Sequence, residues 1–268
     1  MPEETLTPHL ANIRLHPIKA LDPAYIQEGR IGSNGGIERD RVWAMFARDG
    51  RWVNGKLTTA VHLIRAGYND DITQVTLSVP GDRRNIPTVK LDFPGDHERA
   101  SQWFSDYFEQ PVVVRYVPEG VPDDGLASGP TIVSTASLQT ICDLFPEISL
   151  TQARERFRTT LEIDGVPAFW EDQLFAPDEN YCVRFKIGDV AFEGSNPCAR
   201  CPVPPRDSRT GEIITDFTRQ FSAMRRTRLP SWSPAARFDH YYRFATNTRV
   251  PGTQSGKLLR VGDPVILS

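Results

Sequence analysis

The chain has 268 residues, of which 39% are hydrophobic and 24% are charged, as in an ordinary globular protein. Its formal net charge of −3 gives no support to non-specific nucleic-acid binding. No apolar run approaches the ~18 residues that span a bilayer, and the acidic, polar N-terminus differs from a secretory signal or a transit peptide. We therefore expect a cytoplasmic protein that contacts neither nucleic acid nor membrane.

Strand patterns dominate the first 118 residues. Alternating or continuous apolar runs are separated by turn signals such as Asp49-Gly50 and Pro80-Gly81. The predicted strands cover residues 12–16, 41–46, 51–53, 74–79, 88–93 and 111–117. An aromatic stripe over residues 100–108 predicts a short helix before the last of them.

A Pro-, Gly- and Asp-rich segment over residues 118–130 predicts a linker or a long loop. The remainder of the chain alternates short helices with strands. Helices are predicted over residues 138–144, 153–157 and 216–228, and strands over 160–163, 181–187, 189–192, 257–261 and 264–267. The chain is therefore predicted to be mainly β and barrel-like, with short helices.

Two thiols, Cys198 and Cys201, lie three residues apart with Arg200 between them, in a stretch bracketed by prolines that predicts a loop. Thiolates are soft metal ligands and good nucleophiles, and a nearby guanidinium lowers the pKa of a thiol. The other two cysteines, Cys142 and Cys182, stand alone, so a disulfide scaffold is not indicated. The pair could be structural, redox-active, zinc-binding or the ligand of a heavier metal.

Two of these alternatives have little support in the surrounding residues. A structural zinc site needs four ligands, and the five histidines are scattered with no second cysteine pair. A thioredoxin-like pair should open a helix, and the prolines after Cys201 prevent one there. A single nucleophilic or metal-ligating thiolate fits better, with Cys198 as its buried structural neighbour.

The order of motifs along almost the whole chain resembles the MOSC family, which includes the mitochondrial amidoxime-reducing component and bacterial relatives. Similar segments occur in the family's order at residues 13–19 (IRLHPIK), 36–43 (GIERDRVW), 134–138 (STASL), 156–158 (RFR), 171–172 (ED), 184–190 (RFKIGDV), 198–201 (CARC), 207–211 and 261–265 (VGDPV). The resemblance implies an N-terminal β-barrel domain over residues 8–118 packed on a MOSC domain over residues 125–268.

The resemblance also implies a molybdenum cofactor, a pterin dithiolene phosphate that carries the metal. Cys201 would be the protein ligand of molybdenum and the catalytic residue, which suits a soft metal. The resemblance assigns further cofactor contacts to Lys19, Arg41, Ser134, Thr135, Arg158, Cys198, Ala199 and Arg200. Taken alone, Ser134 is most simply a helix cap, and Arg158 is one more surface arginine.

The activity implied is reduction of a small N-oxygenated substrate by a molybdenum-dependent oxidoreductase. The chain has no flavin, haem or iron–sulfur motif, so a separate electron-donor protein is expected. Two alternatives stay open: a sulfurtransferase that carries a persulfide on Cys201, and a non-catalytic carrier of the cofactor. The family is also associated with pyridoxal phosphate binding. The substrate, the electron donor and the oligomeric state do not follow from the sequence.

Several positions depart from the family pattern. Ala20 follows Lys19 where the family has serine, and Thr159 and Thr160 follow Arg158 where it has proline and asparagine. Pro204 lies in a segment after Cys201 that is stiffer and more cationic than usual.

Glu171 and Asp172 could polarise a substrate or belong to a solvated loop.

Overall fold

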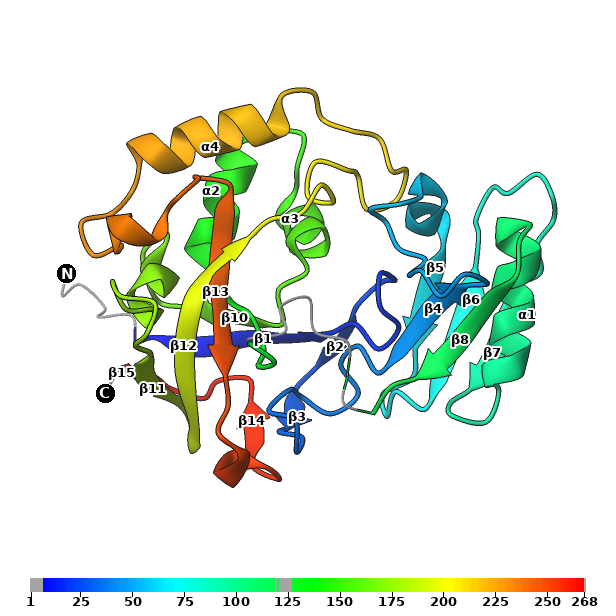
Figure 1. Ribbon diagram of the computed structural model, residues 1–268, viewed down its shortest axis with the longest axis horizontal. Coiled ribbons are helices and arrows are strands. Elements are labelled where there is room, and N and C mark those ends of the chain that lie inside the picture. The colour runs from blue at the N-terminus through cyan, green and yellow to red at the C-terminus, as the bar shows by residue number, and fades with distance from the viewer. Residues whose placement is uncertain (1–6, 119, 121–126, 268) are drawn as a thin grey trace, which may run out of the picture.

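The structure is a computed structural model that describes residues 7–118, 120 and 127–267. Mainly β structure with short helices is confirmed, and the strands fall into two groups that lie along the long axis of the molecule (Figure 1). The predicted domain boundary includes residues 119 and 121–126, which lie outside the described residues, as do residue 268 and the first six residues.

An eight-stranded sheet forms the larger group. Its order is β15 (Val265–Leu267), β11 (Val183–Ile187), β12 (Val190–Ala199), β13 (Arg243–Arg249), β9 (Ile132–Ser134), β10 (Leu161–Asp164), β1 (His9–Leu15) and β2 (Ala24–Ile26). All the pairs are antiparallel except β9 with β10. Two strands from the start of the chain therefore complete a sheet built mostly from its second half.

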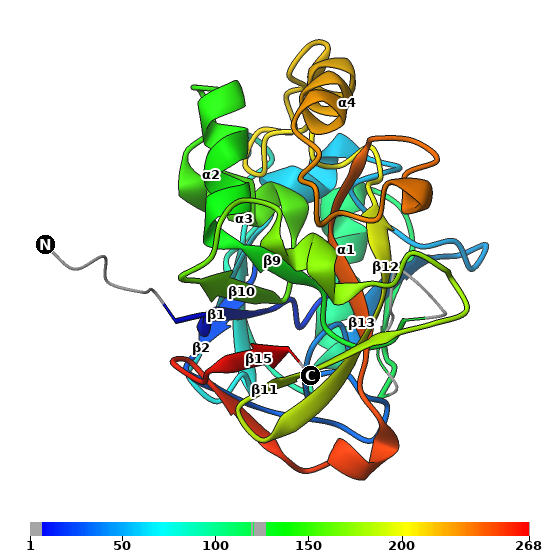
Figure 2. The ribbon, with the colours of Figure 1, turned by 90° about the vertical axis from the view of Figure 1, so that its left-hand side faces the viewer.

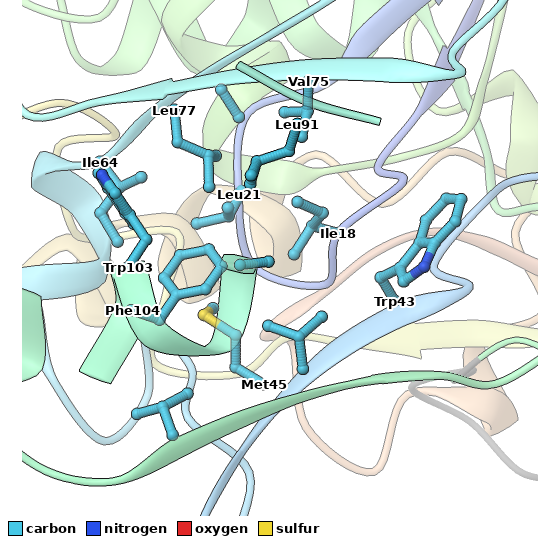
Figure 3. Packing of buried hydrophobic residues seen from close by; sticks show 14 of the residues in the cluster. Ile18, Leu21, Trp43, Met45, Ile64, Val75, Leu77, Leu91, Trp103 and Phe104 are labelled. Carbon is cyan, nitrogen blue, oxygen red and sulfur yellow. The ribbon is translucent and has the colours of Figure 1, made fainter. Parts of the chain in front are cut away.

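The smaller group of strands holds most of the first half of the chain. It contains β4 (Trp43–Ala47) paired with β8 (Val112–Tyr116), and a three-stranded sheet of β5 (Arg65–Tyr68), β6 (Gln74–Ser78) and β7 (Val89–Asp92). Helix α1 (His97–Phe108) buries Trp103, Phe104 and Tyr107 against these strands. Figure 3 shows Phe104 beside Met45 in this core, with Leu21 and Ile18 among the side chains packed there.

Three further helices gather at the end of the molecule that is uppermost in Figures 1 and 2. They are α2 (Thr135–Leu144), α3 (Leu150–Phe157) and α4 (Phe217–Thr227). An aromatic cluster joins them: Phe145, just after α2, stacks on Phe217 of α4 at 4.4 Å, and Phe157 of α3 lies 4.3 Å from Phe244 of β13. This packing fixes the end of α3, and with it the position of the residues that follow.

Short segments complete the fold. β3 (Glu28–Arg30) pairs with β14 (Leu258–Arg260), and there are four 3-10 helices among the described residues. They are η1 (Thr59–Leu63), η2 (Trp170–Leu174), η3 (Ala235–Arg237) and η4 (Gly252–Gln254). No helix in the described part of the chain is both long enough and apolar enough to span a membrane.

Most predicted elements are confirmed to within a few residues, and two are wrong. Residues 51–53 form only an isolated bridge, between Phe46 and Trp52, instead of a return strand. The segment that contains Cys198 is not a loop, because β12 continues through Ala199. Prolines are tolerated there since the β12–β13 register shifts on either side of Asn196 and Pro197, which interrupts the ladder.

Candidate functional site

A cavity of about 660 Å³ lies between the two halves of the chain. The first half contributes Lys19 and Arg41 to its lining, and the second half contributes Arg158, Cys198 and Cys201. Ala199 and Arg200 line it as well. Seven of the nine predicted site residues, which are spread over more than 180 positions of the sequence, therefore face one space.

The cavity is strongly basic in a chain whose net charge is negative. Its basic lining residues are Lys19, Arg41, Lys56, Arg156, Arg158, Arg200 and Arg206, and its acidic ones are Asp22, Asp40 and Glu155. Each of these three carboxylates already has a partner in the protein: Arg65 for Asp22, Arg41 for Asp40, and Ser208 for Glu155. The surplus of positive charge suits an anionic ligand.

Strand β12 brings the two thiols to the cavity. Gly194 allows this strand to pass close to η2, because a Cβ there would lie 1.6 Å from the carbonyl oxygen of Leu174. Beyond the strand, the backbone N–H of Arg200 donates to the carbonyl of Tyr242 at 3.0 Å. Cys198 is therefore placed at the end of β12, and Cys201 follows just after it.

Arg200 distinguishes the two sulfurs. Its Nη1 donates to Cys198 Sγ at 3.1 Å, its Nη2 donates to the carbonyl of Phe157, and its guanidinium lies 5.5 Å from the centre of the Phe157 ring. Burial lowers the pKa of Arg200, but the nearby sulfurs of Cys198 and Cys201 outweigh it and raise that pKa overall. Among the described residues, Cys201 Sγ makes no hydrogen bond, so it is the sulfur left for a ligand.

The segment after Cys201 is attached to α3. Arg156 donates to the carbonyls of Pro204 and Pro205 at 3.3 and 3.1 Å, and its Nη2 lies 3.1 Å from Asp207 Oδ2. Asp207 in turn accepts hydrogen bonds from the backbone N–H groups of residues 209 and 210. The proline-rich departure from the family pattern is thus a fixed wall of the cavity.

Arg41 and Arg158 meet across the two halves. Arg41 Nη2 donates to the carbonyl of Arg158 at 3.0 Å, and both residues have a φ of 53°. Ala20, also in the lining, has a φ of 77°. Left-handed backbone at residues other than glycine costs free energy and tends to occur at functional sites. Lys19 Nζ lies 5.2 Å from the centre of the half-exposed Trp52 ring.

Ser134 and Thr135 do not line the cavity. Ser134 Oγ caps α2 by accepting the N–H of Ser137 at 3.1 Å, and the Thr135 hydroxyl donates to Glu162 at 3.0 Å. The reason is the direction of β9. Thr131, just before the strand, lines the cavity, whereas Ser134, the last residue of the strand, is the N-cap of α2. Thr160, the departure from the family pattern just before β10, lines the cavity instead.

Glu171 and Asp172 are neither solvated nor part of the cavity lining, since each is 1% exposed. Asp172 pairs with Arg225 of α4 at 2.5 Å, so both charges of this buried pair are compensated. Glu171 accepts from Ser137 Oγ at 3.0 Å. Burial, followed by the charge of Asp172, raises the pKa of Glu171 to about 7.

His62 was not predicted as a site residue, yet it lines the cavity from η1. It is 9% exposed, and its Nε2 has no hydrogen-bond partner. The Nε atoms of Arg156, Arg200 and Arg206, which also line the cavity, are buried without partners too. Seven similar atoms belong to residues outside the lining, among them Tyr68 Oη and Arg225 Nε, so the basic lining and the thiols carry the argument for a ligand.

The side chains that line the cavity fit a soft metal that is carried by an anionic organic ligand. They fit less well a metal ion held by protein side chains alone. The cavity offers thiol sulfur and many cationic donors. Within the described ranges, no three His, Cys, Asp or Glu side chains are grouped so that they could share a metal ion. A metal bound here would therefore need ligands that the protein does not supply.

Two family models match the chain. The MOSC N-terminal beta barrel domain matches residues 7–111, and the MOSC domain matches residues 127–266. The chain is also similar to proteins called molybdenum cofactor sulfurase. The one from Drosophila persimilis is 26% identical over 251 residues, which cover 78% of this chain and 30% of that protein. The one from Drosophila willistoni is 23% identical over 252 residues, which cover 84% and 30%. The chain thus spans about 30% of the length of these relatives.

Proposed function

The chain belongs to the MOSC domain family, and we propose that its cavity binds a molybdenum cofactor with Cys201 as the protein ligand of the metal. The observation that carries the proposal is the pair of thiols in a basic cavity, where Arg200 engages Cys198 and leaves Cys201 Sγ without a hydrogen bond. A thiolate is the ligand that a soft metal prefers.

The cationic residues give the cofactor's negative groups their partners. Lys19 and Arg41 would contact it from the first half of the chain, and Arg158 and Arg200 from the second. Guanidinium groups bind phosphate and other oxyanions through paired hydrogen bonds. Ser134 and Thr135 keep their predicted roles only if their hydroxyls leave the partners described above, so we assign the hydroxyl contact to Thr160 and Thr131 of the lining.

We further propose that the loaded protein reduces small N-oxygenated compounds. When bound, the cofactor would supply two-electron oxygen-atom transfer. The protein would hold it, exclude bulk water from the cavity and deliver protons. Electrons would come from a separate redox protein.

Metal analysis tests the assignment. Protein purified from a host that makes the cofactor should contain about one molybdenum per chain. Cys201→Ser should lose it, while Cys182→Ser, which changes a thiol outside the cavity lining, should keep it. Molybdenum at the wild-type level in Cys201→Ser would contradict the assignment.

A second candidate function draws on the name of the relatives, molybdenum cofactor sulfurase. Cys201 could carry a persulfide and deliver sulfur, or the chain could carry the cofactor without turnover. Cyanide releases thiocyanate from a persulfide. Thiocyanate from wild-type protein that lacks molybdenum, and none from Cys201→Ser, would favour sulfur transfer. Bound molybdenum without reduction of any N-hydroxylated compound would favour the carrier.

A further inference from the structure

Two basic residues of the cavity lining, Lys56 and Arg206, have no role in the cofactor contacts proposed above. A third, Arg156, is already held by two backbone carbonyls and by Asp207. Within the described ranges, neither the Lys56 ammonium nor the Arg206 guanidinium makes a hydrogen bond or an ion pair. The three carboxylates of the lining are engaged by other residues. The cavity therefore keeps two positive charges that neither the protein nor the proposed cofactor contacts compensate.

Arg206 has a fixed backbone and an accessible guanidinium. Its N–H donates to the carbonyl of Val203 at 2.8 Å, and a bridge pairs it with Ile213. Its Nε is buried, whereas Nη1 and Nη2, which also have no partner among the described residues, are accessible. These two nitrogens form the end of the fork that binds a carboxylate through two parallel hydrogen bonds. Since Arg206 lines the cavity, the fork can meet a ligand there.

Lys56 approaches the same part of the cavity from the other half of the chain. It follows Gly55, whose backbone lies against the ring of His62: a Cβ on Gly55 would be 2.7 Å from Nε2. Burial lowers the pKa of His62, and the positive charges of Arg158 and Arg206 lower it further, so Arg206 also lies near this ring. Both cationic residues are therefore neighbours of one buried ring, and the side chain of Lys56 is exposed.

Arg206 also lies within reach of a small molecule bound at Cys201. It is five positions after Cys201, so the two Cα atoms are at most about 18 Å apart, and the turn closed by Val203 and Arg206 shortens this distance. Both residues line the same cavity, in which half-exposed Trp52 offers a flat apolar face. A substrate with its N–O group at the metal can therefore place a second group on Arg206.

We propose that Arg206 and Lys56 bind a carboxylate of the substrate, so that the protein prefers N-oxygenated compounds that also carry an acid group. The inference rests on the proposed function and names the class of its substrate. Arg206 supplies the two parallel hydrogen bonds, and Lys56 adds a second positive charge. Arg206 belongs to the segment after Cys201 that is more cationic than the family pattern, so the preference is a property of this chain.

The test compares the binding of benzamidoxime, which is neutral at physiological pH, with that of its para-carboxy derivative. Calorimetry measures both dissociation constants on molybdenum-loaded protein without an electron donor, so that no turnover takes place. Wild type should bind the carboxylated probe about 10- to 100-fold more tightly, the effect of one hydrogen bond to a charged group. Arg206→Gln should bind both probes about equally, and Lys56→Gln should show a smaller preference than wild type.

Arg209→Gln is the matched control. It removes the same charge from the same segment, but the side chain of Arg209 is 61% exposed, pairs with Glu155 and does not line the cavity. It should keep the wild-type preference, which separates a direct contact from an effect of net charge. Arg206→Lys should keep part of the preference, because the charge stays and the paired hydrogen bonds are lost.

The molybdenum content of each sample separates substrate binding from cofactor binding. Loss of molybdenum in Arg206→Gln, with full content in Arg209→Gln, would show that Arg206 holds the cofactor and would overturn the substrate role. Equal affinity of loaded wild type for the two probes, or an undiminished preference in loaded Arg206→Gln, would overturn the inference and leave the cofactor site standing. Wild type that holds no molybdenum but prefers the carboxylated probe through Arg206 would refute the proposed function and leave the carboxylate site standing.

Discussion

Replacing Arg200 by lysine should weaken cofactor binding while keeping the formal charge. The guanidinium makes three contacts at once: with Cys198 Sγ at 3.1 Å, with the carbonyl of Phe157, and with the ring of Phe157 at 5.5 Å. A single ammonium on a flexible stem can keep at most one of the two hydrogen bonds. Burial would also favour the neutral form of the lysine.

The size of the effect follows from these contacts. A hydrogen bond to a charged group contributes about 1.5–3 kcal/mol. Losing one of them corresponds to roughly 10- to 100-fold weaker binding. We therefore expect Arg200→Lys to fold, and to release its molybdenum on dialysis at least ten times more readily than wild type.

The assay is the molybdenum content per chain after dialysis against increasing volumes of buffer. Arg184→Lys is the matched control: its side chain is 81% exposed on β11, lies 3.6 Å from Glu193 and does not line the cavity. Wild-type retention of molybdenum by a folded Arg200→Lys would refute the idea that Arg200 positions the thiol pair.

Two further predictions concern stability. Glu162→Gln leaves the fully buried Arg14 without its charge partner, so we expect a loss of about 3–5 kcal/mol in the free energy of unfolding by urea. Asp49→Asn, in an exposed pair with Arg51, should change it by less than about 1 kcal/mol, and equal effects would contradict the reasoning. For Glu171, the pKa rises from 4.5 to about 7 on folding, so its contribution to stability is full below pH 4.5 and is lost as pH rises to about 7. Compared with Glu171→Gln, wild type should lose up to about 3 kcal/mol across that window, and parallel stability curves would refute the assignment.

The sequence predicts the helices and strands of this fold better than it predicts the contacts between them. Short-range patterns are sufficient for α4 and for β1, β4, β6, β7 and β8, because the apolar period is local. They missed β2, β3 and β5, and they wrongly predicted a strand over residues 51–53. The chemistry of the Cys198–Cys201 pair marks it as a site of interest, whereas the choice of Cys201 and the interest in Arg158 came from the family resemblance. Short-range patterns do not say which end of β9 meets the cavity, and so Ser134 was expected there when Thr131 and Thr160 line it.

Contacts between distant segments account for what the sequence missed. Glu171 and Asp172 resemble a solvated loop until Arg225, 53 residues beyond Asp172, supplies a buried partner. His62 has no local pattern that marks it as a site residue. Its place in the cavity depends on Gly211 and Arg65, which pack η1 against the other half of the chain.

The pairing of β1 with β10 has a consequence for synthesis of the protein. Arg14 on β1 bonds to Thr159, which lies 145 residues later in the chain. At about 5–20 residues per second, a ribosome needs roughly 7–30 s to make that stretch. During this time β2 can pair with one edge of β1, but β10 is missing from the other edge, and unpaired strand edges invite association with other chains. The nascent protein therefore passes through a period of seconds in which a chaperone that shields extended segments would protect it.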